Sequence, residues 1–350
     1  MQMFGSATQI FTLAFLLALP AAAFAQDVVE VANGDKINGD VSRLEAGRLA
    51  FRTASAGAGH QRSAGTISII WTEVARLTTT KALEVELVSG EFFAGTISSP
   101  ASGKFVVQTA TGPSRQLDAR EIIGIVPVEH GFRARTTGSL DFGLNWTHAQ
   151  NARTYTLTGE AKHRSQGHAW ENVFGFDSWL SARDDADRLT RNSATLDLRR
   201  RFSNRWFAVA KFKGQQDEDL ELEGRFLAGG GVGRKLVHTL STRLFVEGGL
   251  DYDAEKYQGD AAYDHGTEAF LGGQWDWNEP GSSTDVKVNA TAFFSLDENR
   301  TRVDFDASVR RDIFWSMYWS VNVFDNFDSN PPGDRPRSSF GVAFALGWSF

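Results

Sequence analysis

Hydrophobic and polar positions alternate strictly over residues 340–350. Bulky apolar side chains fill every second position, while Gly, Ala or Ser fills the positions between them. The apolar set is Phe340, Val342, Phe344, Leu346, Trp348 and Phe350. This period of two predicts a β-strand with one face against an apolar medium. A soluble β-sandwich strand would show the same pattern, but a bulky aromatic edge strand is an aggregation risk that a closed transmembrane barrel removes. We therefore favour a barrel's closing strand and expect these six residues to form its assembly signal.

The same alternation recurs from residue 136 onward in twelve segments. Single-chain bacterial barrels use an even number of strands, each about 9 to 11 residues long. The segments cover residues 139–146, 154–162, 170–180, 194–199, 206–213, 225–234, 244–250, 269–275, 286–294, 303–309, 317–323 and 340–350. The sequence thus predicts an all-β chain whose residues 136–350 form a transmembrane antiparallel β-barrel of about twelve strands.

The predicted connections alternate in length. Those after even-numbered strands are short, as at residues 166–168, whereas most after odd-numbered strands are longer and polar, as at residues 183–187, 215–221 and 251–264. Outer-membrane barrels combine short periplasmic turns with longer extracellular loops. We therefore expect a bacterial outer-membrane location, with the region before the barrel in the periplasm.

That preceding region, residues 27–130, predicts a small β domain with an internal duplication. Residues 33–41 resemble residues 89–97, because in both an apolar strand leads into a Gly-acid turn and a second Gly follows. Gly34 and Gly90 suit the positive φ of a tight hairpin. Two generic hairpin-rich modules with similar turns are the alternative.

The expected modules span residues 27–78 and 80–130, each as a half-open barrel of about five strands. Each copy ends in an apolar segment, at residues 67–71 and 121–126.

The N-terminus predicts a secretory signal peptide over residues 1–25. An apolar run at residues 11–19 precedes an A-x-A cleavage pattern at Ala23 and Ala25. Residues 1–9 contain no Lys or Arg, which departs from the usual signal. The apolar run is shorter than the roughly 18 residues of a spanning helix.

The composition of the chain argues against several classes of function and site. The net charge of -7 argues against a nucleic-acid partner, which selects basic patches. The chain has no Cys, so disulfides and thiolate zinc sites are excluded. Of the 10 Trp residues, all but Trp71 lie after residue 140. This distribution is expected if the Trp side chains of the barrel form girdles at the membrane interfaces.

By the alternation, charges of both signs face the lumen. They are Asp141, Glu160, Lys162, Asp197, Arg199, Arg201, Lys211, Lys213, Arg243, Glu247, Asp285, Lys287, Arg302, Asp304, Asp306 and Arg310. Opposite charges that pair across the lumen would fill it and keep the barrel rigid. A solvated channel whose charges tune selectivity is the alternative. We favour the filled lumen, because twelve strands enclose little space and no segment predicts a plug.

No chemistry-bearing motif emerges. The acids of residues 217–223 and 251–255 could bind divalent cations that bridge lipopolysaccharide. We favour solvated loop acids, because residues 251–255 lack the Gly and distal Glu of a calcium loop. The seven His fall mostly at predicted turns, and no Gly-x-Ser-x-Gly elbow is present. We therefore expect no enzymatic activity, no catalytic residue, no metal and no cofactor.

Residues 33–41, residues 65–77 and the terminal barrel together resemble the salt-induced outer-membrane protein family of Gram-negative bacteria, whose function is unknown. The resemblance implies a barrel in the outer membrane and a link to salt or osmotic stress. It assigns no functional residues.

The expected partners are outer-membrane lipid, lipopolysaccharide and the barrel-assembly machinery, with an unidentified periplasmic partner. The leading hypothesis is a narrow channel or an envelope-stabilising barrel. The alternatives are a lipid-acting outer-membrane enzyme and a periplasmic tether or binding module.

Overall fold

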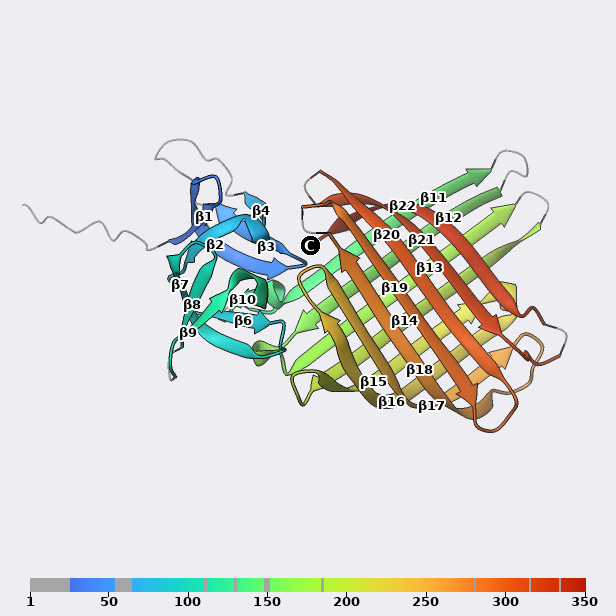
Figure 1. Cartoon of the computed structure of the whole chain (residues 1–350). Helices are drawn as coiled ribbons and strands as arrows, with labels where there is room; N and C mark the ends of the chain where they lie inside the picture. Colours follow the sequence, from blue (N-terminus) through green and yellow to red (C-terminus); the bar gives the residue numbers. More distant parts are fainter. Residues whose placement is uncertain are drawn as a thin grey trace, which may run out of the picture.

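The computed structural model describes residues 26–53, 65–109, 112–128, 131–147, 152–183, 186–279, 281–314, 316–333 and 335–350. It consists of an N-terminal β domain and a closed antiparallel β-barrel, with the domain at one end of the barrel (Figure 1). We call that end proximal and the opposite end distal. The predicted fold class is confirmed, while the expected signal peptide lies outside the described residues.

The N-terminal domain contains one sheet and two 3₁₀ turns. Its elements are β1 (Asp27–Val31), β2 (Lys36–Glu45), β3 (Arg48–Thr53), β4 (Thr66–Ile70), η1 (Trp71–Glu73), β5 (Val74–Thr78), β6 (Leu83–Leu87), β7 (Phe92–Ala101), β8 (Lys104–Thr109), β9 (Arg115–Asp118), η2 (Ala119–Glu121) and β10 (Ile122–Pro127). The sheet order is β4-β3-β2-β10-β6-β7-β8-β9, and β1 pairs with both β2 and β5.

The two halves of this domain share one topology. The first half pairs in the order β5-β1-β2-β3-β4, and the second in the order β10-β6-β7-β8-β9. Gly34 and Gly90 both adopt positive φ, at 92° and 84°, in their equivalent hairpins. This repetition agrees with an internal duplication.

The two apolar segments occupy different positions in the repeated topology. Residues 67–71 lie on β4 and η1, whereas residues 121–126 lie mainly on β10, the counterpart of β5. Both segments are apolar for different reasons. β10 is a central strand between β6 and β2, while β4 is an edge strand that covers the core from one side.

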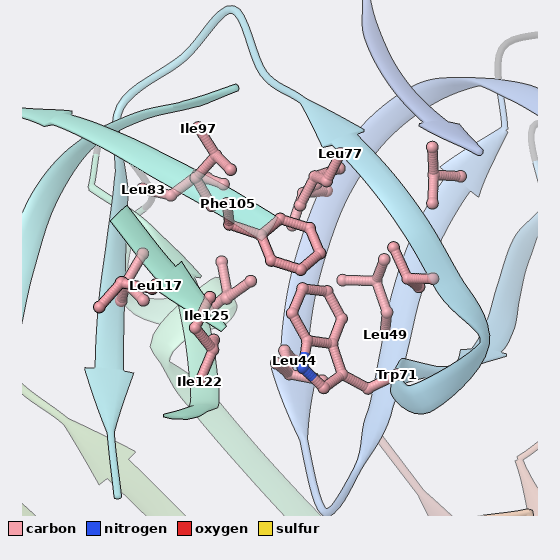
Figure 2. Close-up of a cluster of buried hydrophobic side chains, with 14 of the residues drawn as sticks. Leu44, Leu49, Trp71, Leu77, Leu83, Ile97, Phe105, Leu117, Ile122 and Ile125 are labelled. Carbon is pink, nitrogen blue, oxygen red and sulfur yellow. The ribbon is translucent and has the colours of Figure 1, made fainter. Parts of the chain in front are cut away.

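Apolar side chains from both modules form a single core (Figure 2). The rings of Trp71 and Phe105 stack with centroids 5.1 Å apart, and neither side chain is exposed. Trp71 Nε1 donates a hydrogen bond to the Ala119 carbonyl at 2.8 Å, so its polar atom is satisfied inside the core. These contacts join η1 of one module to η2 of the other, which makes the domain one packing unit.

The barrel contains twelve antiparallel strands, the number expected. They are β11 (Thr136–Thr147), β12 (Ala152–Arg164), β13 (Trp170–Arg183), β14 (Ala186–Arg201), β15 (Trp206–Asp217), β16 (Leu222–His238), β17 (Thr242–Tyr257), β18 (Asp264–Asn278), β19 (Thr284–Ser295), β20 (Thr301–Phe314), β21 (Met317–Asp328) and β22 (Ser338–Ser349). The described residues of this region also include the 3₁₀ turns η3 (Phe132–Arg135), η5 (Gln166–His168) and η6 (Glu218–Leu220).

The first and last strands close the barrel. β22 pairs with β11 from Ser139↔Ser349 to Gly143↔Ala345. Beyond this ladder, Phe350 N–H donates to the Gly138 carbonyl at 2.9 Å, and Gly138 N–H donates to the Phe350 carbonyl at 3.1 Å. Closure satisfies the backbone groups that an open edge would leave unpaired.

The strands are longer than predicted and the distal loops are correspondingly shorter. β16 has 17 residues and β17 has 16, compared with the about 9 to 11 that a membrane crossing needs. The connection expected at residues 251–264 therefore shrinks to residues 258–263. The expected loop at 183–187 shrinks as well, because β13 ends at Arg183 and β14 begins at Ala186. At residues 251–255, alternating inward acids extend the ladder where the acidic composition predicted a loop.

The outer surface of the barrel is apolar. Phe142, Leu144 and Leu346 point outward and are more than half exposed. Exposed Trp side chains gather near the proximal strand ends, at Trp170, Trp206, Trp275, Trp319 and Trp348. Exposed Phe and Tyr side chains lie near both ends, at Phe202, Phe314 and Phe350 on the proximal side and at Phe226, Tyr252, Phe327 and Phe340 on the distal side. Trp179 departs from the expected girdle, because its ring packs inside the lumen against Phe324 with centroids 4.6 Å apart.

Candidate functional site: the barrel lumen

The sixteen charged residues predicted to face inward all lie on barrel strands. Fifteen are buried or half-buried, and the exposed Asp306 borders a cavity inside the lumen. Many take part in ion pairs with neighbouring or opposite walls. The structure does not gather them into one constellation, but distributes them from the proximal to the distal end.

Two ion pairs cross the middle of the lumen. Lys213 on β15 bonds to Asp304 on β20 at 2.5 Å, although 91 residues separate them in sequence. Lys287 on β19 pairs with Glu160 on β12. Between these, Glu247 on β17 pairs with Lys211 and lies 3.8 Å from Arg199 Nε. Opposite walls are therefore tied together by charge.

A denser network closes the distal third of the lumen around Arg300. Its guanidinium bonds to Asp328 on β21 at 2.5 Å, to Glu255 on β17, and to Tyr257 Oη at 2.8 Å. Arg225 on β16 bonds to the same Glu255 at 2.6 Å. All five side chains are at least nine-tenths buried. Charges this deeply buried persist because each is hydrogen-bonded to an opposite charge.

A second distal group extends this network. Arg302 pairs with Glu268 and lies 3.7 Å from Asp253. On the opposite wall, Arg191 bonds to Asp177 at 2.9 Å and lies 3.5 Å from the fully buried Asp217.

The expectation that the acids of residues 217–223 and 251–255 are solvated loop acids was wrong for several of them. Asp217, Asp251, Asp253 and Glu255 are buried inside the barrel. A signal for three of them was present, since residues 251, 253 and 255 share the parity of Arg243 and Glu247 on the same strand. Arg300 carried no such signal, because it lies in the connection between β19 and β20.

An apolar cluster on strands β15 to β19 lines one wall of the lumen. Phe207, Val209, Leu227, Phe245, Phe270 and Phe293 pack together there and are buried. The Arg199 guanidinium lies 4.6 Å from the centre of the Phe245 ring. The cluster was not predicted, because its inward apolar residues alternate with outward apolar residues and give no polar signal for the inner face. The side chains that fill the lumen are therefore partly hydrophobic and partly paired charges.

The lumen is more open from its proximal mouth up to Asp177 and Arg191. A cavity of about 640 Å³ is bordered by Asp141, Asp285, Asn289, Arg310 and Tyr318, and it extends to the N-terminal domain at Glu45 and Arg48. The Asp141 carboxylate accepts hydrogen bonds from Tyr318 Oη at 2.7 Å and Ser320 Oγ at 2.9 Å. A smaller cavity of about 70 Å³ lies beside it, under β6 of the domain.

The N-terminal domain covers the proximal mouth through charged contacts. Glu84 on β6 lies 3.2 Å from Arg135 Nη1 and 3.3 Å from His168 Nε2, and its neighbour Glu86 lies 3.6 Å from Lys235 Nζ. Elsewhere on the interface, Arg48 bonds to Asp312 at 2.8 Å. Docking therefore rests on a set of ion pairs.

Those ion pairs lower the pKa of the domain's acids. Burial by itself would raise the pKa of Glu86, but the positive charge of Lys235 and the nearby His238 and Arg164 lower it to about 2. Glu45 follows the same balance, since Arg164, Lys162 and Arg243 outweigh its burial and lower its pKa to about 2. Both carboxylates are ionised at neutral pH.

The six predicted assembly-signal residues lie on or directly after β22 with their side chains outward, between 38% and 64% exposed. Across the part of the chain that the structure describes, no group of three His, Asp or Glu side chains is arranged to hold a metal ion. No helix in the described ranges is long and apolar enough to cross a membrane.

A closed antiparallel barrel of twelve strands, apolar outside and charged inside, defines the class of transmembrane β-barrels. The chain belongs to the family described as protein of unknown function, DUF481, which matches residues 140–350. No curated protein sequence matches the chain.

Several solved structures are similar to it at low identity. The NanC porin is 8% identical with a TM-score of 0.38, and the match covers 60% of this chain and 98% of that one. A porin refined at 1.8 Å is 7% identical with a TM-score of 0.28, and the match covers 61% of this chain and 99% of that porin. Wzi, an outer-membrane protein involved in group 1 capsule assembly in Escherichia coli, is 10% identical with a TM-score of 0.24. That match covers 93% of this chain and 82% of Wzi.

Proposed function

We propose that this chain is an outer-membrane β-barrel that stabilises the envelope and does not conduct through a continuous open pore. The observation that carries this proposal is the Arg300 network, in which buried arginines and carboxylates from β16, β17 and β21 bond across the distal lumen. A conducting path would need water or ions to displace these pairs, and each broken pair leaves a buried charge without its partner.

The proximal rim supports contact with a membrane interface. Trp170 on β13 is the cross-strand partner of Arg200 on β14, with the guanidinium 5.5 Å from the ring centre. Trp206 and Arg234 repeat this arrangement two strands further on, at 5.3 Å. Trp and Arg are enriched where a barrel leaves the hydrocarbon and meets lipid headgroups. We propose outer-membrane phospholipid as the partner at this rim and lipopolysaccharide as the partner at the distal rim.

The proposed orientation places the N-terminal domain in the periplasm. The proximal connections are short turns such as residues 202–205, as in the periplasmic turns of bacterial barrels. Insertion would use the barrel-assembly machinery, with residues 340–350 as its signal. The resemblance to the salt-induced family supports a role under salt or osmotic stress, and we propose no enzymatic activity and no nucleic-acid partner.

The second candidate is a narrow channel, favoured by the cavity of about 640 Å³ in the proximal lumen. Planar-bilayer recording of the purified full chain separates the two functions. We expect no steady conductance from the wild type, and a rise when Arg300→Ala and Arg225→Ala are combined. Steady wild-type conductance that the double variant does not change would contradict the structural role and favour the channel.

A further inference from the structure

Three basic side chains meet at the neck where the barrel joins the N-terminal domain. Lys162 on β12, Lys235 on β16 and Arg243 on β17 come from different parts of the wall and border the same small cavity. Each side chain is less than a third exposed. The topology therefore directs three cations into one confined space.

These three cations make no hydrogen bond to a side chain or carbonyl within the described residues. Lys162 Nζ lies 3.3 Å from Glu171, which also accepts a hydrogen bond from Arg164. Lys235 Nζ lies 3.6 Å from Glu86, and Arg243 lies 4.0 Å from both Glu45 and Asp276. The carboxylates thus compensate the charge at distances of 3.3 to 4.0 Å, and the donors keep the capacity to bind a further acceptor.

The charge around the cavity is unequal. Its lining holds eight Lys or Arg side chains and three Glu. A volume of about 70 Å³ is too large for one water molecule and suits a small multi-oxygen group. Donors that converge from three strands fit a tetrahedral oxyanion, which has an acceptor for each, better than they fit a planar carboxylate.

The neck continues into the larger cavity of the proximal lumen. Glu160, Lys162, Arg243, Gln274 and Lys287 border both spaces. The larger space of about 640 Å³ is within the usual range of small-molecule pockets. Its lining holds seven Lys or Arg and eight Asp or Glu side chains, together with amides, hydroxyls and aromatic rings. A solute held by an anionic group in the neck would place its remaining atoms there.

We propose that the neck binds the phosphate group of a small solute, with Lys162, Lys235 and Arg243 as the phosphate-binding residues. Access is through the larger cavity, which reaches the interface between the N-terminal domain and the barrel. This inference goes beyond the envelope role, and a conductance measurement does not decide it, because the site lies on the proximal side of the closed distal network.

The test is isothermal titration calorimetry of the folded full chain in phosphate-free buffer of low salt. Inorganic phosphate and glycerol 3-phosphate are the two probes, and sodium chloride is the ionic-strength control. We expect saturable binding of at least one phosphate probe and none of chloride. Tighter binding of glycerol 3-phosphate assigns the larger cavity to the rest of a solute, whereas equal binding assigns the site to phosphate alone.

Variants connect the binding to the named residues. Lys235→Gln and Arg243→Gln should each weaken phosphate binding at least tenfold, because each removes charged donors, and Lys235→Arg should restore most of it. Arg310→Gln is the matched control, since Arg310 borders only the larger cavity and should leave inorganic phosphate binding unchanged. Heat-modifiable gel migration verifies that each variant is folded. No saturable binding to the wild type, or equal binding by folded Lys235→Gln and Arg243→Gln, overturns the proposal.

Discussion

The N-terminal domain and the barrel use the same alternation of side chains in opposite senses. In the domain, Trp71, Phe105 and Leu49 point inward and are fully buried. In the barrel, Phe142 and Leu346 point outward and are more than half exposed, while Arg302 and Glu255 are buried inside. Both patterns have a period of two. The difference teaches that alternation identifies a strand with two unlike faces, and that the surrounding medium decides which face is outside.

The largest expected effect is the loss of a buried ring from the domain core. Phe105→Ala should destabilise the N-terminal domain by about 3–5 kcal/mol, because it creates a cavity beneath Trp71 that the core cannot fill. Phe142→Ala on the barrel surface should cost much less, since lipid can take the space of the missing ring. Urea unfolding of the full chain in vesicles measures both. Equal losses of unfolding free energy for Phe105→Ala and Phe142→Ala would contradict the difference between a packed core and a lipid-facing surface.

A comparable effect is expected when a buried charge loses its partner inside the barrel. Arg300→Ala should destabilise the barrel by up to about 3–5 kcal/mol, because Asp328 remains buried without its cation and Glu255 keeps only Arg225. Arg310→Ala should cost less than about 1 kcal/mol, since water in the neighbouring cavity screens the loss. The midpoint of heat-modifiable migration ranks the two variants. If Arg300→Ala left the stability of the barrel unchanged, the ion pairs of the lumen would not be what stabilises it.

Charge on the outer face provides a third test. Val288→Arg should destabilise the barrel by about 2–4 kcal/mol if the residue lies near mid-membrane, because the cation enters hydrocarbon. Asn289→Arg, one residue along β19 and bordering the large cavity, should cost much less. Urea titration in lipid vesicles compares them. A larger penalty for Asn289→Arg would reverse the assigned faces.

The smallest effect concerns the contact between the two regions. The pKa of Glu86 is lowered to about 2 in the folded chain from an ordinary value of 4.5. Its stabilising contribution is therefore complete above pH 4.5 and is lost as pH falls towards 2. The free energy of unfolding should fall over this range, and Glu86→Gln should flatten the change. An identical pH profile for the variant would show that Glu86 does not link docking to pH.

Much of the architecture could be predicted from sequence, because alternation is a local property. Residues 340–350 specify a two-faced strand without reference to the rest of the chain, and twelve such segments gave the barrel its strand number. Gly34 and Gly90 specified two equivalent hairpins through a backbone conformation that Gly adopts without strain. The same reasoning failed at Asp251 and Asp253, where acidic composition suggested a loop although the parity of the strand continued.

Only the tertiary structure decided what the inward residues do. Lys213 meets Asp304 because strand tilt and closure bring β15 opposite β20, and no local pattern carries that information. Arg300 reaches Glu255 from a connection, and Lys162, Lys235 and Arg243 converge because three strands and the docked domain surround one neck. The sequence by itself determined which medium each face of a strand prefers. The partner of each buried charge, and the place where the lumen stays open, depend on distances across the barrel that exist only after it closes.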